Sequence, residues 1–114
     1  MITQQNYLVT EDEWQQTLID IAHTYGWRVA HFRKAMTLAG NWITPVQAEG
    51  KGFPDLVLAK TGHALVLIEV KSQKGRLSPA QQEWQKVLET IPEILYLVVR
   101  PSDYEEVKEV LSQK

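Results

Sequence analysis

The chain has 114 residues, 44% of them hydrophobic, and a formal net charge of −2. This length suits one compact domain, residues 1–114, and the apolar content is sufficient for a core. The sequence contains no cysteine, which excludes disulfides, thiolate zinc sites and cysteine nucleophiles. No stretch reads as a membrane span or a signal peptide, so we expect a soluble, intracellular protein of the cytoplasm without a membrane partner.

The charge is unevenly distributed along the chain. Eight basic and three acidic residues lie between positions 26 and 76, whereas both ends are acidic. Distribution matters more than the total for a phosphate-binding surface. Acidic helix faces would explain the ends, but they do not explain the basic middle, so a phosphate-facing patch remains an open alternative.

The first half of the chain predicts a helix, a strand and a long loop. Thr10 and Glu13 have the spacing of a capping box, and apolar residues then recur at helical spacing over residues 11–24, with Gly26 as the stop. The alternating segment GWRVAHFRK predicts a strand. Residues 36–52 show no clear period and are expected to form a loop.

The second half predicts two strands, a helix, a strand and a final helix. Residues 53–59 and 64–71 read as strands joined by the turn KTGH. Ser78 and Pro79 then begin a helix whose apolar stripe is Trp84, Val87 and Leu88, and Pro92 ends it. EILYLVV predicts a strand, and Ser102 or Asp103 is expected to cap a helix ending near Leu111. Trp14, Trp27 and Trp84 fall on apolar stripes and are predicted to be core residues. The predicted order is α-β-β-β-α-β-α.

Three charged residues interrupt the two apolar strands of the hairpin. Glu69 and Lys71 point to one side because strand side chains alternate. A hairpin centred on Gly62 places Asp55 opposite Glu69, with Cβ atoms roughly 4.5–5.5 Å apart. Such carboxylates repel each other unless a cation lies between them. That cation is either Lys71, in a structural ion network, or Mg²⁺ or Mn²⁺ in a site for phosphodiester hydrolysis.

These residues resemble the PD-(D/E)XK nuclease signature, formed here by Pro54-Asp55 and Glu69-Val70-Lys71. The longer string GFPDLVLAKTGHALVLIEVKSQKGRLSPAQQEWQKVL, with Glu13, GWRVAHFRK and VVRPSDYEEV, is similar to a stand-alone VRR-NUC domain. The resemblance implies a restriction-endonuclease-like α/β core, a central mixed β-sheet flanked by helices. It also implies a Mg²⁺- or Mn²⁺-dependent endonuclease of phage or bacterial type. Similarity of small members to Holliday junction resolvases implies a homodimer that acts on branched DNA.

The resemblance also assigns roles to individual residues. Asp55 and Glu69 match the metal-binding acids, and the Val70 carbonyl matches the backbone ligand. Lys71 matches the catalytic lysine. Glu13 matches the helical glutamate that completes the acidic site, although helix capping alone would explain a glutamate there. Gln81, chosen over Gln82, matches the glutamine that contacts the centre, although it would otherwise read as a solvated helix residue.

Four basic residues near these positions are candidates for phosphate contacts: Lys51, Lys74, Arg76 and Arg33. A polar loop explains Lys74 and Arg76 equally simply, and a solvated strand face explains Arg33. A second function therefore stays open beside the endonuclease. It is a non-catalytic nucleic-acid-binding or interaction module that keeps the nuclease fold.

Overall fold

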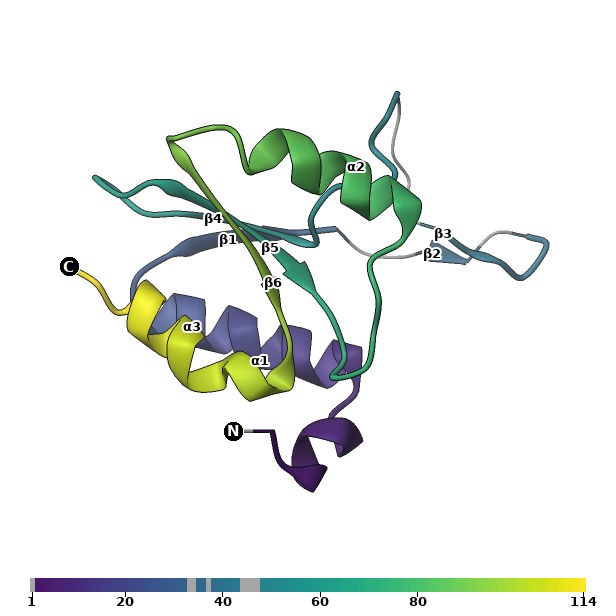
Figure 1. The fold of residues 1–114 in the computed structure, drawn as a ribbon, viewed down its shortest axis with the longest axis horizontal. Helices are drawn as coiled ribbons and strands as arrows, with labels where there is room; N and C mark the ends of the chain where they lie inside the picture. The colour runs from purple at the N-terminus through teal and green to yellow at the C-terminus, as the bar shows by residue number, and fades with distance from the viewer. Residues whose placement is uncertain (1, 33–34, 37, 44–47) are drawn as a thin grey trace.

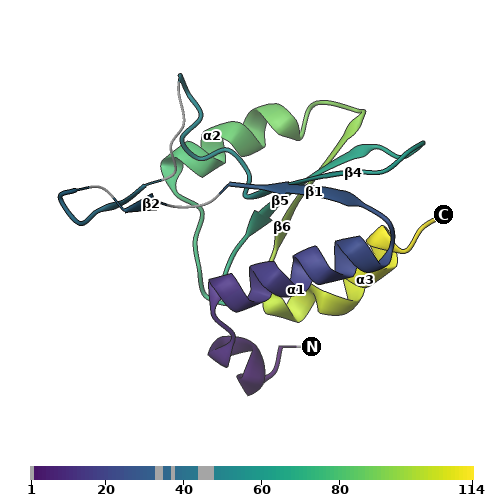
Figure 2. The same ribbon diagram turned by 180° about the vertical axis from the view of Figure 1, so that it is seen from behind.

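A four-stranded mixed sheet forms the centre of the computed structural model, which describes residues 2–32, 35–36, 38–43 and 48–114. The sheet has the order β1-β4-β5-β6, with strands β1 (Arg28–His31), β4 (Leu56–Ala59), β5 (Leu65–Val70) and β6 (Ile94–Val99). The β1–β4 and β4–β5 pairs are antiparallel, and β5–β6 is parallel. Helices α1 (Glu11–Thr24) and α3 (Tyr104–Leu111) cover one face, and α2 (Pro79–Leu88) covers the other (Figures 1 and 2). The predicted α/β class and element order are confirmed.

Helix α1 begins at the predicted cap. The Thr10 hydroxyl accepts a hydrogen bond from the backbone N–H of Glu13 at 3.1 Å, and the Glu13 carboxylate accepts one from the N–H of Thr10 at 2.9 Å. These two bonds satisfy N–H groups that have no partner inside the helix. The following apolar stripe, which includes Trp14 and Leu18, is buried against the sheet. The helix therefore has the predicted bounds and the predicted inner face.

The main core lies between the sheet and helices α1 and α3. It contains alternate residues of the strands together with apolar residues of both helices. Two indoles fix the helices further, because Trp14 Nε1 donates to the Val99 carbonyl at 3.1 Å and Trp27 Nε1 donates to the Leu111 carbonyl at 2.9 Å. Strand β5 is buried on both faces except at its first residue, which explains its nearly continuous apolar sequence.

The segment predicted as one long loop contains a small additional hairpin. Strands β2 (Ala35–Met36) and β3 (Trp42–Ile43) pair antiparallel and lie away from the four-stranded sheet (Figure 1). Strands of two residues are too short to give a readable alternation, which is why the loop prediction was wrong here. A short 3₁₀ helix, η1 (Gln4–Leu8), also precedes α1 and was not predicted.

The prediction for the stripe of α2 was partly wrong. Leu88 is buried, but Val87 is 56% exposed and Trp84 is only half-buried. Trp84 lies on the α2 face of the sheet rather than in the main core, because its ring packs edge-on against Phe53 with centroids 5.0 Å apart. The helix ends at Leu88, four residues before Pro92. The chain then forms a turn, in which the Ile91 N–H donates a hydrogen bond to the Leu88 carbonyl.

The start of α3 also differs from the prediction. A 3₁₀ turn, η2 (Pro101–Asp103), comes first, and Asp103 occupies the position before α3 without a side-chain bond to that helix. Its carboxylate instead accepts a hydrogen bond from the N–H of Arg100 at 2.8 Å. Ser102 pairs with Gln73 in the loop after β5, so it too is used for a tertiary contact. Among the described residues, no helix has the length and apolarity needed to cross a bilayer.

Candidate functional site

Asp55 and Glu69 lie side by side at one end of the β4–β5 hairpin. The observed register pairs Leu56 with Ile68, and continuing it by one residue places Asp55 beside Glu69. Strand β4 begins at Leu56, not at Phe53 as predicted, so Asp55 lies just outside the strand. Its Oδ2 atom accepts a hydrogen bond from the backbone N–H of Val70 at 2.8 Å, which fixes the carboxylate against the end of β5. The predicted pairing is confirmed.

Glu69 is an acid in an almost fully buried position, with only 1% of its surface exposed. One oxygen, Oε1, accepts a hydrogen bond from Gln81 Nε2 at 2.6 Å. The other, Oε2, is buried and has no hydrogen-bond partner among the described residues. Burial raises the pKa of Glu69 to about 9, the negative charge of Asp55 adds to this, and Lys71 opposes it. This carboxyl group therefore holds a proton at neutral pH unless a cation joins it.

Lys71 lies directly after β5 and is 9% exposed. Its N–H donates to the Val99 carbonyl at 3.0 Å, so the backbone ladder with β6 continues to this residue. The ion pairs found among the described residues are surface pairs on α2 and α3, and none joins Lys71 to Asp55 or Glu69. The structural ion network that the sequence left open is thus not formed by direct contacts. The positive charge of Lys71 lowers the pKa of Glu69 without such a contact.

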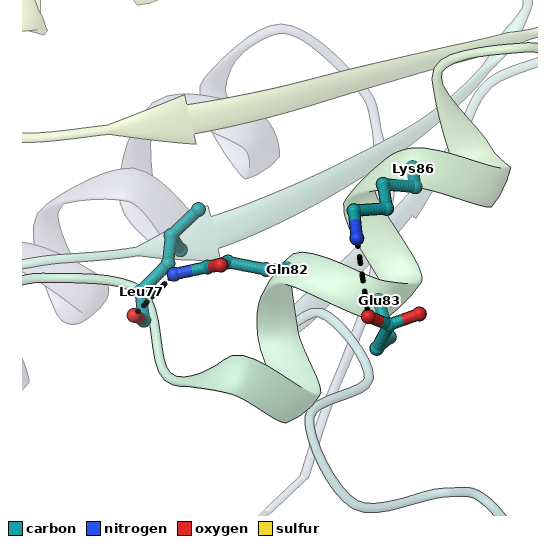
Figure 3. Close-up of polar contacts among 4 residues, drawn as sticks. All are labelled: Leu77, Gln82, Glu83 and Lys86. Atoms are coloured by element: carbon teal, nitrogen blue, oxygen red, sulfur yellow. Dashed lines mark hydrogen bonds and ion pairs between the residues drawn. The ribbon is translucent and has the colours of Figure 1, made fainter.

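Gln81 connects the start of α2 to the acidic pair. Its Oε1 accepts a hydrogen bond from the N–H of Ser78 at 2.8 Å, and its Nε2 is left to donate to Glu69. The Ser78 hydroxyl in turn accepts from the N–H of Gln81 at 3.2 Å, completing a capping box. Gln82 points elsewhere and donates to the Leu77 carbonyl at 3.2 Å (Figure 3). The structure brings Gln81, not Gln82, to the acidic pair.

The loop that carries Asp55 is held against α2 by a close backbone contact. Gly52 has a positive φ of 86°, and a Cβ atom there would lie 2.5 Å from the carbonyl carbon of Ala80. Three residues before Gly52, the Glu49 carbonyl accepts a hydrogen bond from Trp84 Nε1 at 2.9 Å. The loop and the first turn of α2 thus fit together only with glycine at position 52. This contact holds the loop that leads to Asp55 close to the first turn of α2.

We expect Gly52→Ala to destabilise the fold more than Gly62→Ala does. Both glycines have positive φ, but a Cβ at Gly62 meets nothing within 4 Å. The control should lose about 1–2 kcal/mol from its left-handed backbone, and Gly52→Ala a further 1–3 kcal/mol, roughly, from overpacking. Urea unfolding measures both values, and equal losses would contradict the close packing.

The acidic first turn of α1 contains the predicted Glu13 and a second candidate, Glu11. Glu13 is exposed, its carboxylate is engaged at the cap, and these hydrogen bonds lower its pKa. Glu11 is half-buried, and its charge is among those that raise the pKa of Glu69. Glu11 precedes the buried Trp14 by three residues, a spacing that places it on the inner face of the helix. The sequence did not single out Glu11 because the capping-box spacing drew attention to Glu13.

A comparison of two isosteric variants separates the two glutamates. We expect Glu11→Gln to reduce nuclease activity about tenfold or more, because it removes from α1 an anionic oxygen whose charge reaches the acidic pair and which a divalent cation there would attract. Glu13→Gln keeps the capping geometry and should change activity less than about twofold. Steady-state cleavage rates decide this, with melting temperatures as the control for folding. A larger loss for Glu13→Gln would instead support the assignment of Glu13 to the acidic site.

The chemistry of the donors at this end of the hairpin fits a hard divalent cation. The buried Glu69 Oε2 atom lacks a partner, and a second carboxylate lies beside it. Oxygen donors of this kind suit Mg²⁺ or Mn²⁺, which usually keep several waters rather than a full protein cage. The described residues contain no group of three or more His, Cys, Asp or Glu side chains arranged as a metal site. The pair Asp55 and Glu69 would therefore need backbone, water or substrate oxygens as further ligands.

Three of the predicted phosphate contacts lie in the loops before Asp55 and after β5. Lys51 is exposed in the loop before Asp55. Lys74 and Arg76 are exposed in the loop after β5, where the Lys74 ammonium lies 5.1 Å from the ring centroid of Tyr7. Arg100 Nη2 holds this loop by donating to the Gly75 carbonyl at 2.7 Å. Arg33 lies outside the described residues.

Comparison with known proteins agrees with this arrangement. A family model for the VRR-NUC domain matches residues 10–100, which includes α1, the four-stranded sheet and α2. Searches of the curated proteins and of the solved structures found no match. The matched region contains Asp55, Glu69, Lys71 and Gln81 in the order that the resemblance required. The chain belongs to the VRR-NUC domain family and is a nuclease-type domain.

Proposed function

We propose that this protein is a Mg²⁺- or Mn²⁺-dependent endonuclease that hydrolyses DNA phosphodiester bonds at Asp55, Glu69 and Lys71. The observation that supports it best is the buried Glu69 carboxyl, whose Oε2 atom lacks a partner beside Asp55. Burying an acid that has one oxygen without a compensating bond is costly, so a site that retains such an acid has a use for it. Cation binding supplies that use.

In this proposal Asp55, Glu69 and the Val70 carbonyl hold the metal ion. A divalent cation there would lower the pKa of a water molecule and polarise the scissile phosphate. The Lys71 ammonium lies on the same side of the strand as Glu69, where it stabilises the negative charge that develops on the phosphate. Gln81 keeps the Glu69 carboxylate oriented through its 2.6 Å hydrogen bond. A glutamate of α1 completes the acidic site, and the half-buried Glu11 is favoured over the exposed Glu13 that the resemblance assigns.

The DNA backbone would be held by the basic residues around this centre: Lys51, Lys74, Arg76 and Arg33. Such contacts position the substrate without reading its sequence. We further propose a homodimer that acts on branched DNA such as a four-way junction. Cutting two symmetry-related strands requires two active sites related by a two-fold axis, which a homodimer supplies.

A cleavage assay on four-way junction, flap and linear duplex DNA tests this proposal. We expect cutting with Mg²⁺ or Mn²⁺, none with EDTA, and a preference for branched substrates. Asp55→Asn, prepared in the same way, controls for contaminating nucleases. If wild type cuts none of these substrates, or the variant cuts as well as wild type, the protein is the alternative, a non-catalytic nucleic-acid-binding module.

A further inference from the structure

An exposed aromatic ring, Phe32, lies beside the acidic pair, directly after the edge strand β1. Strand β1 pairs with β4 so that His31 lies opposite Leu56, and one further step places Phe32 opposite Asp55. Opposed residues of an antiparallel pair point to the same face. The sheet therefore carries Phe32, Asp55 and Glu69 next to one another, on the face that also carries α2.

Two other rings fix Phe32 in place. Its ring packs edge-on against Phe53 with centroids 5.8 Å apart, and Phe53 packs in the same way against Trp84 at 5.0 Å. Phe53 lies two residues before Asp55, and Trp84 lies three residues after Gln81 on α2. We call Phe32, Phe53 and Trp84 the aromatic row. It extends from α2 to the edge of the sheet along the border of the site.

The end of the aromatic row at Phe32 is exposed to solvent. Phe53 and Trp84 are half-buried, but 44% of Phe32 is exposed. A ring that only packed the loop would gain by being covered, because exposed apolar surface forfeits the hydrophobic contribution. The exposed part of Phe32 is thus available to a ligand that arrives next to Asp55.

The charge around Phe32 favours a nucleic-acid ligand. Arg28 is exposed on the same face of β1, four residues away and thus about 13 Å along the strand. The residue between them on that face, Ala30, is exposed and small. Lys51 is exposed in the loop that leads to Phe53. Exposed aromatic rings combined with cationic side chains are what bind single-stranded nucleic acid, since bases stack on the rings and phosphates meet the cations.

We infer that Phe32 stacks an unpaired nucleobase next to the scissile phosphate, and that this contact selects branched or single-stranded regions of DNA over continuous duplex. The inference rests on the proposed nuclease function and adds a subsite to it. In a continuous duplex the bases are already stacked on each other and cannot meet the ring without unstacking. At a flap or junction an unpaired base is free to do so.

The test is a binding measurement without cleavage, in EDTA, with DNA that carries 2-aminopurine as an unpaired base. Stacking on the ring should quench its fluorescence with wild type. We expect Phe32→Leu to weaken binding of this DNA about tenfold and to remove the quenching, with less than about a twofold change for fully paired duplex. Phe32→Trp should restore both. Tyr104→Leu removes another exposed ring, on α3 at the opposite face, and should change neither.

The outcomes separate this inference from the proposed function. Equal effects of Phe32→Leu on paired and unpaired DNA, or no effect at all, would overturn the stacking role, provided that its melting temperature matches wild type. A changed sedimentation coefficient with unchanged DNA binding would show that Phe32 contacts a second copy of the chain instead, and it would also overturn the inference. If wild type fails to cleave any DNA but the quenching follows Phe32, the nuclease proposal fails and the base subsite stands.

Discussion

Glu69→Gln should stabilise the metal-free protein above neutral pH while lowering metal-dependent cleavage at least about 100-fold. Glutamine matches the size of the protonated acid and can still accept the hydrogen bond from Gln81 through its carbonyl oxygen. The glutamine amide does not ionise, so the variant never acquires a buried negative charge that repels Asp55 as the pH rises. The same change removes an anionic oxygen from the proposed metal site, so stability and activity move in opposite directions.

The pH dependence follows from the direction of the pKa shift. The pKa of Glu69 is about 9 in the folded protein against an ordinary value of 4.5, chiefly because the group is buried. Between these values the folded chain holds a proton that the unfolded chain has released, so the free energy of unfolding falls as pH rises. The contribution of Glu69 is complete below about pH 4.5 and is lost as pH approaches 9.

Thermal unfolding in EDTA at a series of pH values measures this effect. Wild type should lose stability between about pH 5 and 9, whereas Glu69→Gln should lose distinctly less over the same range. Glu83→Gln, in an exposed surface pair, is the matched control and should keep the wild-type slope. Adding Mn²⁺ should stabilise wild type more than Glu69→Gln. A variant that keeps the full wild-type slope would show that another group causes it.

The geometry of the acidic pair could be predicted because short-range rules determine it. The turn KTGH is short enough that its centre, Gly62, sets the register of the whole hairpin. Once the register is set, the alternation of side chains decides which residues face each other. Gln81 was assigned only through the family resemblance, and the structure shows that the capping box at Ser78 holds its side chain at the start of α2.

Other features depend on contacts between distant segments and could not be predicted. Glu11 and Glu13 both occur in the acidic first turn of α1, and only the packing of Trp14 against the sheet shows which of them faces inward. Trp84 would fall on the apolar stripe of α2 whichever face of the sheet that helix covers, so the sequence does not show which face it packs against. The pairing of β1 with β4 brings Phe32 to Asp55. It joins two strands that are 24 residues apart in the chain, and local sequence patterns do not predict which strands pair over such a separation.

Lys71→Met should reduce cleavage by roughly 10²–10³-fold, with a smaller effect on DNA binding. Methionine retains much of the buried stem of the lysine, which Gly75 covers so closely that a Cβ there would lie 3.3 Å from Lys71 Cδ. The variant therefore removes the charge while largely keeping the packing. The loss falls on the catalytic rate because the ammonium is needed most when negative charge develops on the phosphate.

The lysine has a second effect that the same variant reveals. Its positive charge lowers the pKa of Glu69 against the effects of burial and Asp55. Without it Glu69 holds its proton more firmly, and a cation must compete with that proton for the carboxylate. Cleavage by Lys71→Met should therefore need more Mg²⁺ or Mn²⁺, and a higher pH, to reach its reduced maximum.

Lys74→Met is the matched control for this variant. Lys74 is exposed, three residues further along the chain, and contacts the Tyr7 ring rather than the acidic pair. Its loss should raise KM and reduce the salt dependence of binding without changing the metal requirement. If Lys71→Met behaved like Lys74→Met, with KM alone affected, the lysine would be a phosphate anchor. The buried acid would then need another partner to lower its pKa for metal binding.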